Sequence, residues 1–503
     1  MADPSQVRVP ASAEPGAEEH ASGAGVCFPK IDGRRSTTAT CRGVLADAAG
    51  AVDPDLEGRI RSSEQWRSDY LDFVRAITVR SAGRESSLAI AGAGLQSMRA
   101  QLVVERAREV ANLDHALEQI EPSRELGVGR VNGNASPVRT LRVPYRGRDL
   151  DGAELARQLD RWVDAGSVEP SFADAVNRVI ENPDWLALPG RKVALVGAGA
   201  EIGPLQPLCS WGAQVIALDV DRPRVWERIG EAARAGAGTV EIPLAADGAQ
   251  GVDVICELPE TRALIDRSAG EDDLVLGMYA YADGGTHVRL SGAFDALATD
   301  LLAHRPATAL SFLATPTDAF VVPPEIVSHA RSAYAQRRLR KLLQAPVRAL
   351  SRGGLYAPAY RDGVPVADAL VKQQGPNYAL AKRLQRWRGV LADAIGRQVS
   401  FNVAPATWTR SVTKNRILAA AYAGAHHFGI EIFEPSTTRV LMAALLVHDL
   451  HQAPSPTSEP ERLFSDAAAH GGLWRAAYEP RSALGLAALA GLPSSLMRRR
   501  DAV

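Results

Sequence analysis

The chain has 503 residues, a formal net charge of −1 and an apolar content of 46%. This length predicts two or three units around a sizeable core. The balanced charge gives no electrostatic reason to expect binding to nucleic acid or to an anionic membrane. Four separated cysteines without a metal-binding pattern, and a start without a secretory leader, favour reduced thiols in a cytoplasmic protein. The longest apolar block, residues 440–447, is too short for a membrane span.

Two regions of different character come before the first glycine-rich motif. Residues 1–60 are rich in Ala, Gly, Ser, Pro and charged residues, which predicts a disordered arm. Residues 61–185 predict a mainly helical N-terminal unit, because apolar residues recur at helical spacing. Within this unit, residues 136–145 alternate between apolar and polar and indicate a strand. A turn-rich segment places the boundary near residue 185.

The next stretch combines two buried strands with a glycine turn. Residues 193–196 form an apolar run typical of a parallel strand, and a second run, 215–218, ends at Asp219. Three glycines follow the first run: Gly197, Gly199 and Gly203. Such glycines let the backbone approach a pyrophosphate at a helix N-terminus, and the acid can accept hydrogen bonds from a ribose. The pattern predicts a dinucleotide site; the alternative is a βαβ unit whose glycines only permit tight packing.

Strands and helices continue to alternate after residue 221, which predicts a parallel, doubly wound sheet. The loops at 283–287 and 315–318 follow strands and are candidate pocket loops, or plain turns. The expected strands are 239–243, 252–256, 274–281 and 309–314, and the expected helices are 259–268, 288–303 and 324–343.

A second motif lies on a predicted helix over residues 376–395. Tyr378 and Lys382 are four residues apart and therefore share one helix face. A neighbouring ammonium favours the phenolate and lowers the pKa of a tyrosine, which suits a general acid or base. The alternative is two unrelated surface residues. Residues 399–403 then read as a strand, followed by a loop marked by Pro405.

Taken in order, these segments resemble the short-chain dehydrogenase/reductase family over residues 190–425. The matching segments are V-G-A-G-A-E-I-G at 196–203, Asp219, Y-A-L-A-K at 378–382 and N-V-A-P-A-T-W-T at 402–409. The resemblance implies a Rossmann fold with NAD or NADP as the cofactor. It also implies Tyr378 as the proton donor or acceptor, with Lys382 holding the ribose and lowering the pKa of the tyrosine.

The resemblance also assigns the remaining site residues. Ser351 is the best match to the family's catalytic serine, although it could equally cap a turn. Asp219 favours NAD over NADP, since a 2′-phosphate would meet its carboxylate, and Arg222 and Arg224 weaken that preference. The residues expected to contact the cofactor are Gly197, Ala198, Gly199, Glu201, Ile202, Gly203, Asp219, Pro405 and Thr407.

The chain departs from the family pattern in three respects. Glu201 stands at the position of a motif glycine, and a carboxylate near a pyrophosphate is unfavourable unless it points away or is neutralised. The family's Asn-Asn-Ala-Gly motif is missing. The stretch from Gly197 to Tyr378 is long, so we expect an inserted strand–helix unit.

The C-terminal part offers fewer signals. His448 and His451 flank Asp449 at the end of an apolar helix, but a third ligand is not evident, so we predict helix-end histidines and no metal site. The apolar segment 417–451 indicates core, a lid over a substrate pocket, or a dimer helix. Residues 452–464 read as a linker, followed by helices at 464–477 and 482–489.

The sequence thus predicts an α/β protein with three parts after the arm. These are a mainly helical unit at 61–185, a Rossmann-type domain with a doubly wound parallel sheet at 186–451, and a linker with a helical C-terminal extension at 452–503. The expected function is an NAD(P)-dependent oxidoreductase acting on a carbonyl/alcohol pair of a small or lipid-like molecule. The alternatives are a non-catalytic nucleotide-binding scaffold or sensor, and an epimerase or dehydratase that recycles its cofactor. A small-molecule substrate is expected, and a homo-oligomer is left open.

Overall fold

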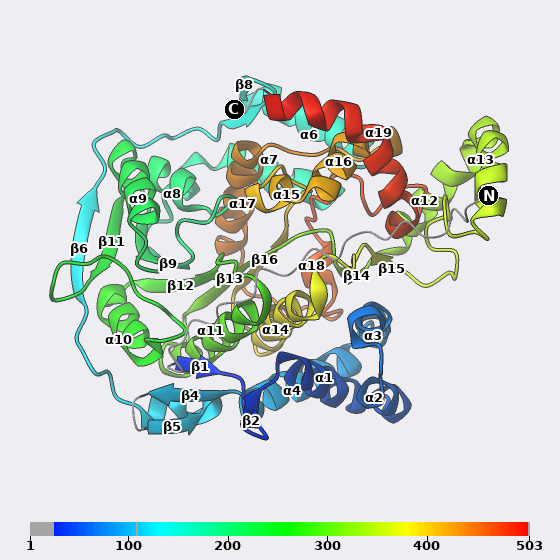
Figure 1. Ribbon diagram of the computed structural model, residues 1–503. Coiled ribbons are helices and arrows are strands. Elements are labelled where there is room, and N and C mark those ends of the chain that lie inside the picture. The colour runs from blue at the N-terminus through cyan, green and yellow to red at the C-terminus, as the bar shows by residue number, and fades with distance from the viewer. Residues whose placement is uncertain (1–24, 107–108, 501–503) are drawn as a thin grey trace.

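The computed structural model describes residues 25–106 and 109–500, and a seven-stranded sheet lies at its centre (Figure 1). The strand order is β16-β13-β12-β9-β10-β11-β6; six strands are parallel, and β6 pairs antiparallel with β11. The first parallel strand lies in the middle, and the chain builds outward on both sides of it, as in Rossmann-like folds. The strands are β6 (Gly127–Asn132), β9 (Arg191–Val196), β10 (Gln214–Leu218), β11 (Thr239–Leu244), β12 (Asp273–Met278), β13 (Ala309–Ala314) and β16 (Val399–Val403).

Helices cover both faces of this sheet (Figure 1), which explains why its strands are continuous apolar runs. On one face lie α8 (Leu205–Trp211), α9 (Pro223–Ala235) and α17 (Pro435–Leu450). On the other face lie α10 (Leu258–Ala269), α11 (Gly284–His304) and α14 (Gly375–Ala394). The predicted α/β class with a mostly parallel sheet is therefore confirmed.

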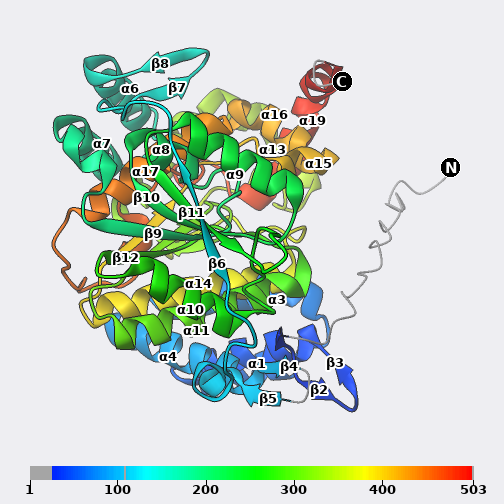
Figure 2. The same ribbon diagram turned by 90° about the vertical axis from the view of Figure 1, so that its left-hand side faces the viewer.

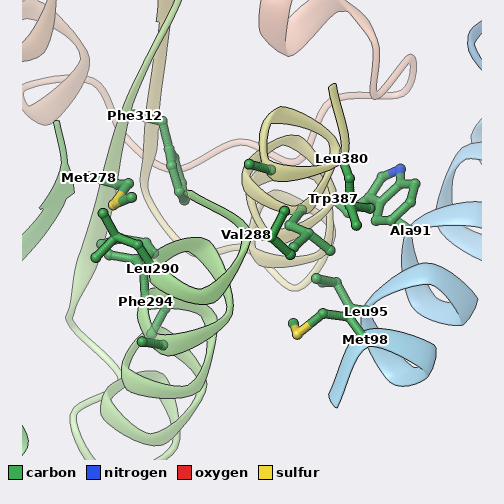
Figure 3. Close-up of a cluster of buried hydrophobic side chains, with 14 of the residues drawn as sticks. Ala91, Leu95, Met98, Met278, Val288, Leu290, Phe294, Phe312, Leu380 and Trp387 are labelled. Atoms are coloured by element: carbon green, nitrogen blue, oxygen red, sulfur yellow. The ribbon is translucent and has the colours of Figure 1, made fainter. Parts of the chain in front are cut away.

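The N-terminal region forms a further layer beneath α11 and α14. Its helices are α1 (Thr37–Gly50), α2 (Pro54–Arg61), α3 (Trp66–Arg80), α4 (Arg84–Gln101) and the short α5 (Ala116–Gln119). Its strands are β1 (Gly25–Cys27), β4 (Val103–Arg106) and β5 (Glu109–Asn112) in one sheet, and β2 (Lys30–Ile31) with β3 (Arg34–Arg35) in a hairpin. Figure 3 shows Leu95 and Met98 of α4 beside Trp387 of α14. A methyl group at Gly94 would lie 2.3 Å from the Trp387 ring, so this glycine permits the close helix contact.

The predicted disordered arm over residues 1–60 is wrong for residues 25–60, and residues 1–24 lie outside the described residues. Ser36 and Asp53 cap α1 and α2 by accepting hydrogen bonds from the amides of Ala39 and Leu56. Leu45 of α1 is fully buried in the main core. The Ala- and Gly-rich composition therefore concealed two capped helices.

Buried ion pairs join the N-terminal layer to the helices under the sheet. Asp295 on α11 accepts hydrogen bonds from Arg99 on α4 at 2.7 Å and from Arg388 on α14 at 2.6 Å. Glu260 on α10 pairs with Arg106 of β4. Because the carboxylates of Asp295 and Glu260 are buried, these contacts fix the layer in one position.

Several predicted elements differ from the structure. The expected strand at 252–256 is a turn, and of residues 136–145 only β7 (Val143–Tyr145) is a strand, paired with β8 (Arg148–Leu150). The expected helix at 464–477 is reduced to α18 (Arg462–Ser465). The helix at 324–343 divides into α12 (Pro324–Gln336) and α13 (Arg338–Leu350). Together with β14 (Ala319–Val321) and β15 (Val366–Asp368), these form the expected insertion between β13 and α14.

The remaining helices complete the upper layer. They are α6 (Gly152–Asp164), α7 (Pro170–Glu181), α15 (Arg410–Lys414), α16 (Arg416–Gly424) and α19 (Pro480–Arg500). The strand β6 was not predicted; Figure 2 shows it crossing the edge of the sheet from the N-terminal helices to the β7–β8 hairpin. Of the helices in the described ranges, none combines the length and the apolar character that crossing a membrane requires.

Candidate functional site

The glycine loop that follows β9 is shaped by tight backbone contacts. Gly197 has a φ of 84°, and its amide donates to the carbonyl of Leu218 at 2.8 Å. A Cβ at Gly197 would lie 2.4 Å from the backbone of Ala280, just after β12. Glycine is therefore required here, and the loop after β12 lies directly against the glycine loop. Both loops are at the carboxyl ends of their strands, where ligands of such sheets bind.

Asp219, at the end of β10, is part of the same loop assembly. Its Oδ2 accepts from the amide of Gly199 and its Oδ1 from the amide of Val220, each at 2.9 Å. Burial raises the pKa of Asp219, and the two amide hydrogen bonds and the charges of Arg222 and Arg228 oppose that rise. The carboxylate thus lies at the glycine loop, where the sequence predicts a ribose contact.

The loop also offers donors for an anion. Among the described residues we find no acceptor for the amides of Glu201 and Ile202. Arg439 of α17 donates to the carbonyl of Glu201 at 3.0 and 2.7 Å, which places a positive charge beside these amides. Amides without an acceptor next to a cation form a donor set suited to an anionic group.

The Glu201 side chain is engaged by a neighbouring helix. Its Oε2 accepts from the amide of Arg410 at 2.9 Å, and Arg410 is the first residue of α15. A carboxylate is favourable at a helix N-terminus, because it satisfies a free amide and complements the helix dipole. The residue that departs from the family pattern therefore links the glycine loop to α15.

A second group of side chains lies at the carboxyl end of β13. Tyr378, in the first turn of α14, has its hydroxyl 3.2 Å from Thr315 Oγ1, directly after β13. Lys382 follows one turn later, and its Nζ donates to the carbonyl of Leu313 at 3.3 Å and to Gln385 Oε1 at 3.0 Å. The Nζ lies 5.9 Å from the centre of the Tyr378 ring. The structure thus brings Tyr378 and Lys382 together beside the carboxyl ends of the parallel strands.

Ser351 does not take the position expected of it. Its hydroxyl donates to the carbonyl of Arg348 and accepts from the amide of Leu355, each at 3.1 Å, at the end of α13. Ser351 therefore closes a turn, and Thr315 makes the contact with Tyr378. The signal for Thr315 was its position directly after a buried strand, in a loop already noted as a candidate.

The expected lowering of the tyrosine pKa is also wrong. Burial raises the pKa of Tyr378 to about 12, although the hydrogen bond with Thr315 acts in the opposite direction. Burial lowers the pKa of Lys382 to about 8. Withdrawal from water disfavours both the phenolate and the ammonium, and it is the largest cause of both pKa shifts.

His287, in the first turn of α11, is a site residue that sequence reasoning did not single out. Its buried ring is nearly parallel to that of Tyr378, at 11°, with the ring centres 5.9 Å apart. Burial and then the charge of Lys382 lower its pKa to about 3, so the ring is neutral. Nδ1 accepts from the amide of Ala282, which leaves the proton on Nε2. Among the described residues this Nε2 has no partner.

The other predicted cofactor contacts differ in their surroundings. Ala198 is buried and donates its amide to Leu218, so it supports the loop. The buried Thr407 hydroxyl donates to the carbonyl of Pro405 at 2.8 Å and lies 2.7 Å from the hydroxyl of Thr438. Through these contacts Thr407 fixes the loop after β16.

The histidines at the end of α17 have structural partners. His451 stacks on Trp185, with the ring centres 4.6 Å apart, and His448 lies 3.0 Å from Asp449. Asp449 also accepts from Ser400 at 2.7 Å. Within the described ranges, His, Cys, Asp and Glu residues form no group of three that could hold a metal ion.

No protein-family model matches the chain, and the search of curated proteins found no match. What the protein does therefore has to follow from the geometry of the glycine loop and the Tyr378 cluster. These two groups lie at the same edge of the sheet, at the carboxyl ends of β9, β12 and β13.

Proposed function

We propose that the protein is an NAD(P)-dependent oxidoreductase that acts on a carbonyl/alcohol pair, with Tyr378 as the general acid or base. The observation that carries the proposal is the 3.2 Å contact between the hydroxyls of Tyr378 and Thr315, with Lys382 nearby. This contact lies at the carboxyl ends of the parallel strands, as does the glycine loop. In this proposal the finer fold assignment is a doubly wound dinucleotide-binding sheet. Gly199, Glu201, Ile202 and Asp219 would hold the cofactor.

The protonation states favour carbonyl reduction. With a pKa of about 12, Tyr378 is protonated at neutral pH and can donate its proton to a carbonyl oxygen. The reduced nicotinamide, when bound, would supply the hydride to the carbonyl carbon. The phenolate that remains on Tyr378 would be stabilised by the hydroxyl of Thr315, whose hydrogen bond lowers the pKa of Tyr378. In the reverse direction, the same phenolate takes the proton of an alcohol.

Asp219 supports NAD as the preferred cofactor. Its carboxylate would repel a 2′-phosphate, and it already occupies the acceptor position beside the glycine loop. Arg222 and Arg228 lie close enough to affect its charge and would reduce the discrimination.

The first experiment is a titration of purified protein with NADH and NADPH, followed by nicotinamide fluorescence. The variant Gly199→Asp should abolish binding, because its Cβ would lie 2.6 Å from Val225 Cγ1 and 3.2 Å from Asp219 Oδ2, and its side chain would place a second carboxylate in the loop. The matched control is Gly83→Asp, which adds the same charge before α4, where a Cβ meets nothing within 4 Å. If the wild type binds neither cofactor, the proposal fails.

The second experiment tests the assigned acid. Tyr378→Phe removes the proton donor and keeps the ring, so reduction of a carbonyl substrate found by screening should slow by about 10²- to 10⁴-fold. NADH binding should stay at the wild-type level. Turnover that survives this substitution would show that Tyr378 is not the acid.

A further inference from the structure

Tyr281 is a large aromatic residue that remains 58% exposed beside the half-buried Tyr378. It follows Ala280 directly, and the Ala280 backbone is the group that approaches Gly197. On its other side, the centre of the Tyr281 ring lies 6.3 Å from that of Tyr378. Tyr281 therefore follows the backbone that contacts the glycine loop, and its ring lies near the proposed proton donor.

Two further contacts restrict the Tyr281 ring. Its hydroxyl donates to Asp283 Oδ1 at 2.9 Å, and its ring centre is 5.3 Å from that of His287 at a tilt of 48°. His287 is itself buried and tied to the amide of Ala282. A ring restricted by such contacts loses less freedom when a ligand covers it, which favours binding.

We propose that the exposed face of Tyr281 stacks on the nicotinamide ring of the cofactor, an inference that rests on the proposed function. In a hydride-transfer site, the planar group that has to lie between the pyrophosphate loop and the proton donor is the nicotinamide. Offset aromatic stacking stabilises such a pair. The oxidised ring carries a positive charge, and a tyrosine face attracts a cation. Tyr281 is thus a positioning residue.

The test compares NAD⁺ with ADP-ribose, which has the same adenosine and pyrophosphate and lacks the nicotinamide. Calorimetry on the full-length protein measures both ligands for the wild type, Tyr281→Leu and Tyr281→Phe. We expect Tyr281→Leu to weaken NAD⁺ about tenfold, consistent with one stacking and cation–π contact. ADP-ribose should change by less than about twofold in both variants. Tyr281→Phe should retain most of the NAD⁺ affinity, because it keeps the stacking ring and loses only the hydroxyl contact with Asp283.

The outcomes separate this inference from the proposed function. If the wild type binds NAD⁺ and Tyr281→Leu retains that affinity, the inference is overturned while the proposed function stands. Equal weakening of NAD⁺ and ADP-ribose also overturns it, because Tyr281 would then act on the adenosine half or on the loop. Failure of wild type to bind any dinucleotide overturns both. Unchanged ADP-ribose binding by Tyr281→Leu shows that the variant is folded.

Discussion

The hydroxyls of Thr315 and Tyr378 meet although 63 residues separate them in the chain. Each can donate or accept, so the pair can pass a proton or stabilise a charge on either oxygen. A neutral hydrogen bond of this kind contributes about 1 kcal/mol, which corresponds to roughly a fivefold change in an equilibrium or a rate. Its value in the proposed reaction lies in orienting Tyr378 and sharing the phenolate charge.

Substitutions at Thr315 and Ser351 show which of the two hydroxyls assists Tyr378. Thr315→Val keeps the shape and removes the hydroxyl, so kcat for carbonyl reduction should fall about five- to tenfold. Thr315→Ser should restore most of this loss. Ser351→Ala serves as the control and should leave kcat unchanged, because that hydroxyl closes a turn after α13. A larger loss in Ser351→Ala than in Thr315→Val would return the role to Ser351.

The lowered pKa of Lys382 predicts a measurable dependence of stability on pH. Its pKa is lowered from 10.5 to about 8 in the folded protein, so between these values the unfolded chain binds more protons than the folded chain. The free energy of unfolding should therefore receive a contribution that rises with pH from about 8 to 10.5. Urea denaturation at several pH values, compared with Lys382→Met, isolates this contribution. Identical pH profiles for the two proteins would contradict the lowered pKa.

At the scale of elements, the contact between α4 and α14 depends on one glycine. Gly94→Ala should reduce the free energy of unfolding by about 1–3 kcal/mol, because the new Cβ would lie 2.3 Å from the Trp387 ring. Gly92→Ala, on the same helix, is the matched control. A Cβ there meets nothing within 4 Å, so the higher helix propensity of alanine should stabilise by up to about 1 kcal/mol. Urea denaturation of both variants checks the opposite signs.

The elements that sequence patterns predicted share one property. Their buried residues follow one another in the chain or recur at a regular helical spacing. The strands β9, β12 and β13 are continuous apolar runs, and α14 carries a long helical pattern. By contrast, β6 contains two glycines and is largely exposed, so its pairing with β11 depends on the sheet edge and not on its own sequence. Composition favoured disorder for α1, whose buried residues are three alanines with Thr40, Cys41, Val44 and Leu45.

The residues of the candidate site also fall into two groups, those that the sequence could predict and those that it could not. Residues close together in the sequence, such as Gly197 with Gly199 or Tyr378 with Lys382, could be predicted from their spacing. Thr315 could not be chosen over Ser351, because only the folded sheet decides which hydroxyl reaches α14. The raised pKa of Tyr378 was missed for a related reason, since burial depends on every layer packed around it.

At the scale of the whole molecule, the N-terminal layer and the sheet share one core, and Asp295 lies between them with two arginine partners. Asp295→Ala should lower the free energy of unfolding by about 3–5 kcal/mol, because Arg99 and Arg388 would lose their buried counter-charge. Glu118→Ala is the control: its pair with His115 is exposed and should contribute almost nothing. Equal effects of the two substitutions in urea denaturation would contradict the role of Asp295.

The order of this layer in the chain has a consequence for biosynthesis. Residues of α4 that pack on Trp387 leave the ribosome nearly three hundred residues before α14 is complete. At a synthesis rate of about 5–20 residues per second, the apolar face of α4 waits roughly 15–60 s for its partner. During that interval nascent chains on one messenger could associate through this face. We therefore expect the apolar face of α4 to become buried only after α14 has emerged from the ribosome.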